Sequence, residues 1–573
     1  MNKTNQNSFA AEGLAHVKGA TAPPLLQKTI GDLLKDTVDQ HREDIAVVFS
    51  SEGLRWTWGE FHDRVLKLAA GLQSLGLKPG ERLGIWAPNR SEWLLTQFAT
   101  AQIGVILVTI NPAYLQSELE YSIAKIGLKV LVVAQGYKST DYVQILTSIF
   151  PNLSKSQDKR ITDARFPTLE TIVNLGSSRV EGMVPFDSLL ASTAPISPAC
   201  DLGLRPHDPI NIQFTSGTTG MPKGATLTHH NIVNNGWFVA RAMRLTQADR
   251  LCIPVPLYHC FGMVLSVLAC VSVGAAMVFP GEVFDPTATL RAVSDEQCTA
   301  LHGVPTMFIS QLTLPNFDTY DLRSLRTGMM AGAPCPIEAM RNVMSRMNMS
   351  EVTIGYGMTE TSPVSFQSET EDPIEKRVAT VGRILPHLEV KIIRADGTTA
   401  QIDEVGELCT KGYSVMHGYW DDDAKTREVV RDGWMHTGDL ASIDSEGYCS
   451  IVGRLKDMVI RGGENIYPRE VEEFIYGMPQ VREVQVFGVP DSKYGEELCA
   501  WIILKDNCQL TAEDVSSYCR GKIAHFKIPR HVKFVDALPL TVSGKPQKFV
   551  MSKLMDEELK VARAVAAVAP LET

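Results

Sequence analysis

Short apolar runs alternate with amphipathic stretches through roughly the first 450 residues of the chain. Runs that are apolar at nearly every position fit strands buried on both faces, and apolar residues at helical spacing fit helices that cover a sheet. Repeated strand–helix alternation therefore predicts an α/β fold of mainly parallel, helix-covered sheets. We expect strands at residues 45–49, 83–86, 105–110, 130–133, 210–214, 275–279 and 352–356, and helices at 61–75 and 92–102.

The pattern changes after about residue 380, where strand-like segments follow one another with turn signals between them. Residues 390–394, 406–410 and 448–452 are strand-like, and the pairs Asp396-Gly397 and Asp432-Gly433 favour tight turns. This indicates a smaller β-rich subdomain. After residue 454, a compact α+β unit is predicted, with helices at 468–476 and 512–524 and strands at 481–489 and 500–504.

These changes divide the chain into an N-terminal extension (1–30), a large domain (31–453), a small C-terminal domain (457–560) and an alanine-rich tail (561–573). The polar N-terminus gives no sign of a secretory signal. The uncharged stretch 261–279 has the length of a membrane span, but a glycine interrupts it. We expect a buried helix followed by a strand there, with a membrane span as the alternative.

Composition narrows the classes of function. A hydrophobic content of 44% and a charged content of 21% are typical of globular proteins. The formal net charge of −10, with no basic tract, argues against a nucleic-acid partner. The eleven cysteines form no CxxC pair, and several lie among apolar residues. They indicate core residues in a reducing compartment rather than a disulfide framework, so a cytoplasmic protein is expected.

The most informative segment reads Thr-Ser-Gly-Thr-Thr-Gly-Met-Pro-Lys-Gly and directly follows the predicted strand 210–214. Glycines let backbone N–H groups approach an anion, and hydroxyls and a lysine add donors suited to phosphate. A Walker-type loop needs G-x-x-x-x-G-K-[ST], whereas here Gly224 stands in place of Ser/Thr. The sequence predicts a phosphate loop of another kind, with a flexible surface loop as the alternative. Its residues are Thr215, Ser216, Gly217, Thr218, Thr219, Gly220, Met221, Pro222 and Lys223.

Three later side chains suit a nucleotide. Tyr356 stands between two glycines at the end of a predicted strand, where its ring could stack on a base. Glu360 offers the hard oxygen ligand that Mg²⁺ prefers. Asp439, after a Thr-Gly pair, could accept two hydrogen bonds from vicinal hydroxyls. Taken one at a time, a core tyrosine, a solvated glutamate and a turn aspartate are the more ordinary explanations.

In this order, and over residues 33–553, the segments resemble the signatures of the adenylate-forming (AMP-binding) superfamily, which contains acyl-CoA synthetases, luciferases and peptide-synthetase adenylation domains. The resemblance implies ATP binding by the phosphate loop, adenine stacking by Tyr356, phosphate contact by Thr359 and Mg²⁺ binding by Glu360. It also implies that the backbone flanking the adenine is that of Gly332, Ala333 and Pro334.

The same resemblance assigns the C-terminal signatures. Asp439 would bind the ribose with Arg454 as its partner, and residues 454–455 would form the junction before a hinge at Lys456. Gly463 would let the pantetheine arm of coenzyme A pass close to the backbone. Lys545 would bridge the reacting carboxylate and the α-phosphate, although a solvated surface lysine is the ordinary explanation for such a residue.

The acyl group would lie beside Pro256-Leu257-Tyr258-His259, which resembles an aromatic segment next to the family's acyl pocket. His259 could gate that pocket or be a hydrogen-bonded core histidine. Small glycines would leave volume for a linear apolar acid. We expect the pocket to draw on Val304, Met330, Gly332, Gly357 and residues near His259.

The motifs together predict an ATP-dependent acid–CoA ligase that forms an acyl-adenylate and then acyl-CoA, releasing pyrophosphate and AMP. The segments at 355–360 and 381–383 look most like the medium-chain fatty acyl-CoA synthetase branch. The expected substrate is a medium- to long-chain fatty acid, with ATP and coenzyme A as co-substrates and Mg²⁺ as cofactor. A homodimer and peripheral membrane contact are left open.

Four alternatives remain from the sequence. An aromatic acid–CoA ligase would share every motif above. A stand-alone adenylation enzyme would load a carrier protein, but no carrier module with a D-S-L-type serine follows Lys545. A luciferase-like oxidase would need an oxygenation signature that the sequence does not display. A non-catalytic nucleotide-binding protein is disfavoured because Lys545 and Glu360 are both retained.

Overall fold

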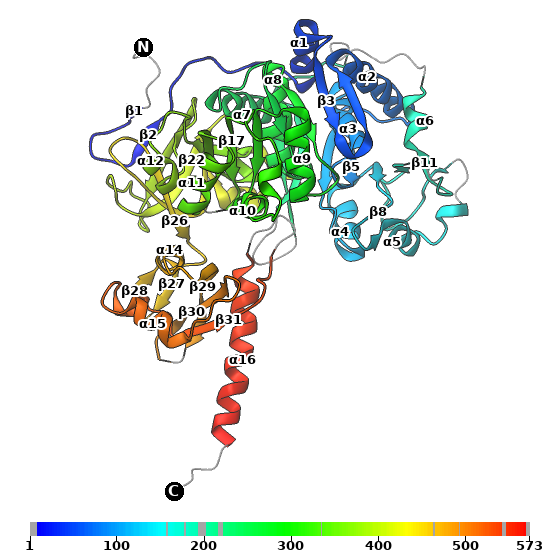
Figure 1. Cartoon of the computed structure of the whole chain (residues 1–573). Coiled ribbons are helices and arrows are strands. Elements are labelled where there is room, and N and C mark those ends of the chain that lie inside the picture. The colour runs from blue at the N-terminus through cyan, green and yellow to red at the C-terminus, as the bar shows by residue number, and fades with distance from the viewer. Residues whose placement is uncertain are drawn as a thin grey trace.

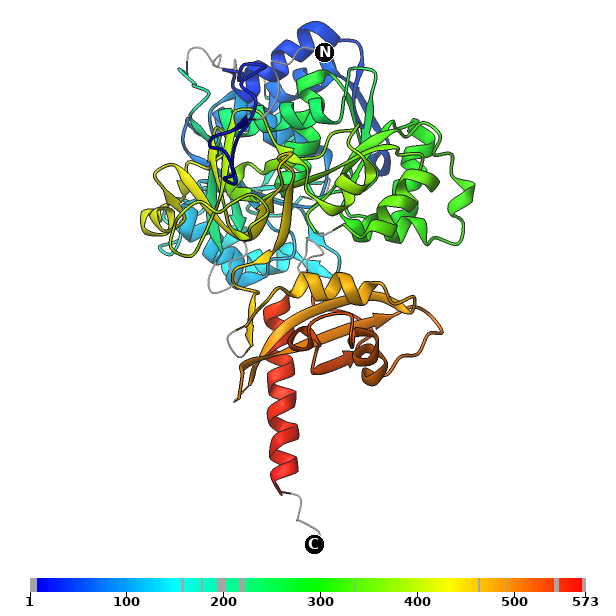
Figure 2. The same cartoon turned by 90° about the vertical axis from the view of Figure 1, so that its left-hand side faces the viewer.

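The computed structural model describes residues 8–155, 159–176, 179–192, 202–215, 222–333, 335–461, 464–491, 493–540 and 546–568. Figures 1 and 2 show a large body and, below it, a small body from which helix α16 (Lys548–Val568) projects. The large body holds two mainly parallel sheets, one large antiparallel sheet and a two-stranded antiparallel sheet of β8 (Gly136–Tyr137) and β9 (Thr140–Asp141), and the small body holds a further sheet. The predicted α/β fold class, with a small α+β C-terminal domain, is confirmed.

The first parallel sheet runs in the order β11-β10-β7-β5-β6-β12-β13-β23. Neighbours from β11 to β12 are parallel, and β13 and β23 are antiparallel at the edge. Every residue of β6 and β7 is buried, as expected for strands covered on both faces. The strands are β5 (Arg82–Trp86), β6 (Ile106–Ile110), β7 (Val130–Val133), β10 (Thr171–Asn174), β11 (Val184–Pro185), β12 (Pro209–Thr215), β13 (Lys223–Thr228) and β23 (Gly418–Tyr419).

The second parallel sheet runs in the order β20-β19-β18-β17-β16-β14-β15-β3-β4. Its central neighbours from β18 to β3 are parallel, and the strands at both edges are antiparallel. The strands are β3 (Ile45–Phe49), β4 (Leu54–Thr57), β14 (Arg250–Cys252), β15 (Ala276–Phe279), β16 (Ala300–Gly303), β17 (Thr327–Ala331), β18 (Glu351–Gly357), β19 (Val364–Gln367) and β20 (Arg383–Ile384).

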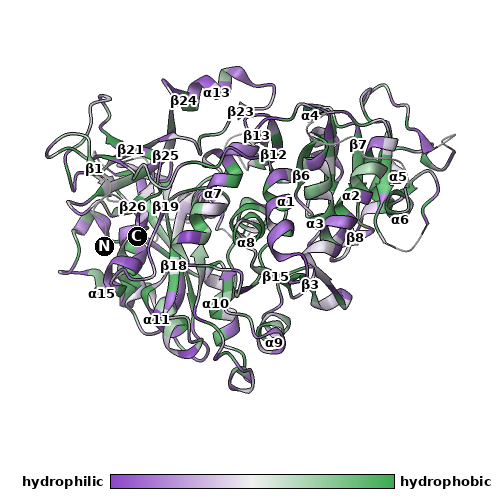
Figure 3. Cartoon of the chain, turned by 90° about the horizontal axis from the view of Figure 1, so that it is seen from above, coloured by the Kyte–Doolittle hydropathy of each residue, from purple (hydrophilic) through white to green (hydrophobic). Residues whose placement is uncertain are grey.

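Helices cover both sheets, and α7 contacts strands of each. On α7 the buried amide of Asn235 donates to the Val364 carbonyl and accepts from the Val364 N–H, which fixes β19 against the helix. Figure 3, seen from above, shows hydrophobic positions gathered on central elements such as α8. The helices are α1 (Ile30–His41), α2 (Trp58–Ser74), α3 (Ser91–Gln102), α4 (Gln116–Ile126), α5 (Tyr142–Ile149), α6 (Phe186–Leu190), α7 (His229–Ala242), α9 (Pro286–Glu296), α10 (Pro305–Leu312), α11 (Ile337–Arg346), α12 (Ile374–Ala379) and α13 (Asp423–Val429).

The uncharged stretch lies in the core. It forms the π-helix η5 (Phe261–Leu268), the short helix α8 (Ala269–Val273) and then strand β15. Gly274 ends α8 in a left-handed conformation, with φ of 75°. The whole of η5 is buried, so the predicted buried helix and strand are confirmed. In the part of the chain that the structure describes, no helix combines the length and apolarity that crossing a bilayer requires.

The β-rich subdomain is an antiparallel sheet in the order β1-β2-β21-β22-β25-β24, with β26 paired to β25. Its first two strands come from the N-terminal extension, where the sequence predicted none. Val17 of β2 pairs with Val390 of β21, so the extension covers an edge of the sheet. The strands are β1 (Ser8–Phe9), β2 (His16–Lys18), β21 (Leu388–Ile393), β22 (Gly406–Gly412), β24 (Val430–Arg431), β25 (Trp434–Ile443) and β26 (Cys449–Arg454).

The small body contains the sheet β28-β27-β30-β29, with β31 beside β30. Helix α15 (Ala512–Cys519) is shorter than the predicted 512–524, because Arg520 is not helical and Gly521 takes a positive φ of 71°. Helix α16 continues to Val568, through the first part of the predicted tail. The other elements are β27 (Val459–Arg461), β28 (Glu464–Ile466), β29 (Val481–Asp491), β30 (Gly495–Leu504), β31 (His531–Phe534) and α14 (Pro468–Tyr476).

The two bodies are joined by a short turn. Strand β26 ends in the antiparallel sheet at Arg454, and β27 begins in the C-terminal sheet at Val459. Lys456 lies exposed in the turn between them, at the position of the predicted hinge. Across this junction, Arg469 Nη1 of α14 donates to the carbonyl of Ile451 at 2.8 Å. The domain limits themselves stay predictions.

Candidate active site

Three predicted site segments of the large domain lie at the carboxyl ends of strands in the two mainly parallel sheets. Thr215 ends β12, Ala331 ends β17 and Gly357 ends β18. Since neighbouring parallel strands end at the same edge, residues 331–333 and Tyr356 are brought side by side, with Ala331 paired to Gly355. Ligands of open α/β sheets bind outside such strand ends.

The phosphate loop is closed at its base by a strand pair. Thr215 pairs with Lys223 across the antiparallel β12–β13 ladder, and the Tyr121 hydroxyl donates to the Pro222 carbonyl at 3.0 Å. Residues 216–221 between them lie outside the described residues. The loop therefore leaves and re-enters the first parallel sheet, whereas Tyr356 lies on the second parallel sheet and Asp439 on the antiparallel sheet.

Glu360, the predicted metal ligand, is a buried carboxylate held by a tyrosine. It lies in the 3-10 turn η7 (Thr359–Thr361), and the hydroxyl of Tyr419 donates to its Oε1 at 2.8 Å. Burial, followed by the charge of Glu360, raises the pKa of Tyr419, so the phenol stays protonated. Lys223 Nζ lies 5.0 Å from the centre of the Tyr419 ring. The predicted phosphate-binding lysine and the predicted metal ligand thus share one tyrosine.

Asp439, the predicted ribose ligand, is a second buried carboxylate held by a tyrosine. Tyr356 Oη donates to Oδ2 at 2.5 Å, and Arg454 Nε lies 3.1 Å from Oδ1. Burial and then the charge of Asp439 raise the pKa of Tyr356, which keeps this phenol protonated as well. Carboxylate oxygens can accept more than one hydrogen bond, and binding of a ribose diol by Asp439 stays a prediction. The structure therefore unites the three predicted adenosine contacts.

Asp439 stands on a bulge in β25. In the β22–β25 ladder Glu407 pairs with Leu440 and Cys409 pairs with His436, so residues 437–439 face the single residue between them. Gly438, at the centre of this bulge, has a positive φ of 70°. A bulge of this kind re-aims a side chain out of the sheet.

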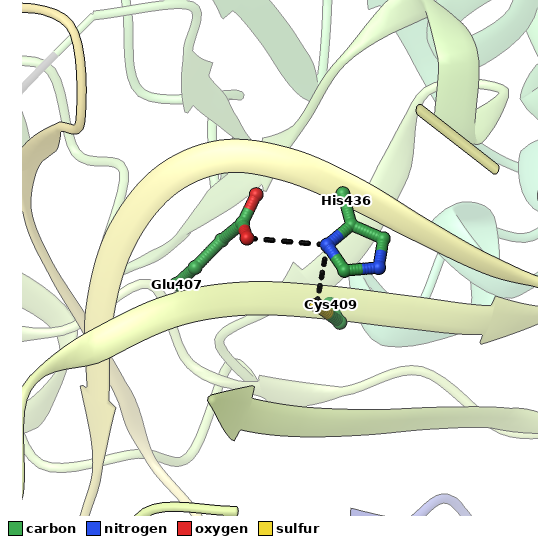
Figure 4. Close-up of side chains that lie close together, drawn as sticks. All are labelled: Glu407, Cys409 and His436. Atoms are coloured by element: carbon green, nitrogen blue, oxygen red, sulfur yellow. Dashed lines mark hydrogen bonds and ion pairs between the residues drawn. The ribbon is translucent and has the colours of Figure 1, made fainter. Parts of the chain in front are cut away.

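Beside the bulge lies a compact group of Glu407, Cys409 and His436, whose potential ligand atoms are all within 4.8 Å of one another (Figure 4). His436 Nδ1 is 3.1 Å from Glu407 Oε2 and 3.6 Å from Cys409 Sγ. Burial, with the charge of Glu407, raises the pKa of Cys409 to about 12, so the thiol stays protonated. In the structure the three side chains therefore form a hydrogen-bonded cluster around His436.

His259 lies half-buried at the start of η5. Its Nδ1 accepts the N–H of Phe261 at 3.2 Å, and its carbonyl accepts the N–H groups of Gly262 and Met263. These bonds begin the π-helix, a rare element that is frequent at functional sites. A gating role for His259 stays a prediction.

Next to His259, the buried thiol of Cys260 connects two parts of the site. It hydrogen-bonds Gln213 Oε1 of β12 at 3.0 Å, and also the side chain of Thr359. Burial and the charge of Glu360 raise the pKa of Cys260, which keeps the thiol neutral. Thr359 therefore lies against the strand that carries the phosphate loop.

The residues predicted to contact the adenine and the acyl group differ in their exposure in the structure. Gly332 has a positive φ of 88°, and a Cβ there would lie 3.2 Å from Val304, so a larger residue would be strained. Gly357 is exposed, whereas Met330 is fully buried in a core cluster with Phe308. Met330 is therefore a packing residue in this structure.

Several predicted residues lie outside the described residues: Ser216, Gly217, Thr218, Thr219, Gly220, Met221, Pro334, Gly463 and Lys545. For Lys545 the flanking backbone is described, and Leu540 forms a bridge with Pro546. The roles of all these residues stay predictions.

The sequence reasoning missed Tyr419, Gln213 and Glu407. Tyr419 meets Glu360 across 59 residues of sequence, and Glu407 meets Gly438 across 31. The run Gly418-Tyr419-Trp420 resembles an ordinary strand end, and no spacing within the sequence marks such long-range pairs.

Comparisons with known proteins agree with this geometry. The family described as AMP-binding enzyme matches residues 34–420, and its C-terminal domain matches residues 470–545. A Bacillus subtilis protein whose name assigns it as an acyl-CoA synthetase is 49% identical over 532 residues, covering 92% of this chain and 96% of its own. The mitochondrial medium-chain acyl-CoA ligase of Bos taurus is 44% identical over 560 residues, covering 96% and 91%.

Among solved structures, an anthranilate CoA ligase in complex with anthranoyl-AMP superposes with a TM-score of 0.82 at 25% identity, covering 94% of this chain and 99% of that one. The family matches extend over most of the chain, and the relatives match nearly whole length to whole length. The chain therefore belongs to the AMP-binding enzyme family, and the predicted enzyme class, an AMP-forming acid–CoA ligase, is confirmed.

Proposed function

We propose that this acid–CoA ligase activates a medium-chain fatty acid. The observation that carries the substrate class is the 44% identity, over 96% of this chain, to a medium-chain acyl-CoA ligase. The buried, uncharged helix η5 directly after His259 supports an apolar acid, because a second charged group there would be costly to bury.

In the first step, a carboxylate oxygen of the acid forms a bond to the α-phosphorus of ATP. The bond from that phosphorus to the bridging oxygen breaks, and pyrophosphate leaves with the oxygen. Crowded anions must be neutralised and aligned, so positioned cations and hydroxyls supply most of the rate enhancement. We assign this task to Lys223, Thr359 and Lys545, and the grip on adenosine to Tyr356 and Asp439.

In the second step, the sulfur of coenzyme A attacks the acyl carbon, the bond to the adenylate oxygen breaks, and AMP leaves with that oxygen. The thiol proton is released to water. A lysine between acid and phosphate would obstruct the thiol, so Lys545 has to withdraw. A rotation of the small domain about Lys456 would provide this, since Lys456 lies in the turn between two sheets.

Glu360 fits Mg²⁺ by its chemistry. It is a buried carboxylate whose one described donor is the neutral phenol of Tyr419, so its negative charge is available to a hard cation. When bound, Mg²⁺ would neutralise phosphate charge. Tyr419 would orient Glu360, and Lys223, whose Nζ lies 5.0 Å from the centre of the same ring, would contact the phosphates.

A second candidate is an aromatic acid–CoA ligase, favoured by the fold similarity to the anthranilate CoA ligase. Pyrophosphate release should be measured with acetate, octanoate, palmitate, benzoate and cinnamate, each with and without coenzyme A. We expect the largest kcat/KM with octanoate. A maximum with benzoate or cinnamate would instead identify an aromatic acid ligase, and acyl transfer to a carrier protein but not to coenzyme A would exclude a CoA ligase.

The composition bears on the cellular compartment of the enzyme and on the class of its substrates. Every cysteine that the structure describes is free, which supports a reducing compartment, and we propose the cytoplasm. The net charge of −10 supports small-molecule substrates rather than nucleic acid.

Replacing Lys545 by alanine tests its assignment. Loss of the cation between two reacting anions should slow adenylation by at least ~10²-fold, comparable with loss of one strong electrostatic contact. Thioester formation from a synthetic acyl-adenylate should be affected much less, because the lysine is then withdrawn. The two half-reactions are followed separately as pyrophosphate and acyl-CoA, and an equal loss in both would contradict the assignment.

A further inference from the structure

The bulge that carries Asp439 interrupts the ladder between β22 and β25, while Asp439 stays paired with Arg454 of β26 on the other side. Residues 437–439 lie between the pairs Cys409–His436 and Glu407–Leu440, so the regular strand bonds are interrupted there. Backbone N–H groups that lose their ladder partner need another acceptor, and Gly438, which is partly buried, is at such a position.

The carboxylate of Glu407 supplies one acceptor inside the bulge and also contacts the ring of the histidine just before it. Its Oε1 accepts the N–H of Gly438 at 3.2 Å, and its Oε2 lies 3.1 Å from Nδ1 of His436. Figure 4 shows Glu407 pointing at the His436 ring from the neighbouring strand. Glu407 of β22 therefore contacts both neighbours of Thr437, namely His436 and Gly438.

Thr437 completes the bonding within the bulge. Its hydroxyl donates to the Leu408 carbonyl at 2.8 Å and accepts the N–H of Asp439 at 3.1 Å. By contrast, a Cβ built at Gly438 meets no described atom within 4 Å. Packing thus does little to hold Gly438, and hydrogen bonds do most of it.

We propose that Glu407 is a positioning residue for ATP: by fixing Gly438 and His436 it holds the bulge that aims Asp439 at the ribose. This inference rests on the proposed role of Asp439. A charged acceptor makes stronger hydrogen bonds than a neutral one, which suits a glycine that is otherwise free to change conformation.

The bulge also reaches the junction between the domains. The carbonyl of Gly438 accepts the N–H of Leu455 at 2.8 Å, one residue before Lys456. The N–H of Gly438 therefore donates to Glu407, and its carbonyl accepts a hydrogen bond from the junction. Loss of Glu407 loosens both at once.

The test compares Glu407→Met with Glu407→Gln. Methionine keeps the length and volume but has no oxygen acceptor, whereas glutamine keeps a carbonyl oxygen for the Gly438 N–H. We expect Glu407→Met to raise the KM for ATP about tenfold, the effect of one charge-assisted hydrogen bond, and Glu407→Gln to retain most of the affinity. The KM for the fatty acid should stay at the wild-type value in both variants.

A second readout separates positioning from general damage. Each enzyme is assayed with ATP and with 3′-deoxy-ATP, and the ratio of the two kcat/KM values measures how well the ribose hydroxyl is recognised. Glu407→Met should lower this ratio toward that of Asp439→Asn. The matched control is Cys409→Ala, two residues along the same strand and in contact with His436 but not with Gly438; it should keep the wild-type ratio.

The outcomes test the positioning role of Glu407 separately from the ribose assignment of Asp439. A Glu407→Met enzyme with a wild-type ratio, whatever its thermal stability, would overturn the positioning role. An Asp439→Asn enzyme that keeps the wild-type ratio would overturn the ribose assignment itself, and the inference with it. Stoichiometric zinc in the purified protein that disappears in Cys409→Ala would also overturn it, because Glu407 would then be a metal ligand.

Discussion

Two buried carboxylates, Glu360 and Asp439, are held in similar ways but in different electrostatic surroundings. Each accepts a hydrogen bond from a tyrosine: Tyr419 at 2.8 Å and Tyr356 at 2.5 Å. Asp439 has in addition the guanidinium of Arg454 at 3.1 Å. No described ion pair joins Glu360 to a cation: Lys223 Nζ lies 5.0 Å from the centre of the Tyr419 ring, and Arg454 acts on Glu360 only through its charge at longer range.

This difference separates two kinds of ligand. A carboxylate already paired with a guanidinium attracts a further cation weakly but can still accept hydrogen bonds from neutral hydroxyls. A buried carboxylate held by a neutral phenol keeps its charge for a cation. The comparison thus predicts that Glu360 governs the dependence on Mg²⁺ and that Asp439 governs the dependence on the ribose.

The largest effect is expected for Glu360→Gln. The amide preserves shape and the contact with Tyr419 but removes the charge, so adenylation should slow by ~10²–10³-fold, the range seen when a strong electrostatic contact is lost. Pyrophosphate release is measured across a Mg²⁺ titration, which should shift to higher concentrations. An unchanged Mg²⁺ dependence would break the comparison, since Glu360 would then have no cation to hold.

A smaller effect is expected for Asp439→Asn. Loss of charge-assisted hydrogen bonds worth ~1.5–3 kcal/mol should raise the KM for ATP by ~10–100-fold. The Mg²⁺ titration and the KM for the acid should match those of the wild type. ATP binding is followed by initial rates at saturating acid; a shift in Mg²⁺ dependence as large as that of Glu360→Gln would show that the two carboxylates do not have separate tasks.

The smallest effects are expected for the two tyrosines. Tyr419→Phe and Tyr356→Phe each remove one donor to a carboxylate but leave the carboxylate charge in place, so the effect on ligand binding is indirect and is expected to be ~2–10-fold, or ~0.5–1.5 kcal/mol. Tyr419→Phe should act on the Mg²⁺ requirement and Tyr356→Phe on the KM for ATP. Both variants are assayed with both titrations, and thermal melts control for folding. Exchanged phenotypes would contradict the pairing seen in the structure.

Much of the fold could be predicted because it depends on signals within short stretches of the sequence. Helix α14 (Pro468–Tyr476) and strand β3 (Ile45–Phe49) have the predicted bounds, since a proline start and a continuous apolar run are local signals. The strands of the N-terminal extension could not be predicted, because their pairing with β21 depends on residues far along the chain.

The site divides in the same way. The signature residues were found because each motif is contiguous, and the structure brings Tyr356, Asp439 and Arg454 into one contact group. Tyr419 and Glu407 were missed because their partners are fixed by strand register and by a bulge, neither of which is visible in the sequence.

The position of the Asp439–Arg454 pair has a consequence for how an intermediate is retained. Arg454 is the last residue of β26, and the proposed pivot at Lys456 follows it, so both members of the pair lie on strands of the antiparallel sheet. A rotation about Lys456 would turn a different face of the small domain toward the active site, while the Asp439–Arg454 pair would stay in place. The acyl-adenylate would therefore stay bound through its ribose while the small domain rotates. The mixed anhydride, which water can hydrolyse, would not have to leave the enzyme between the two half-reactions.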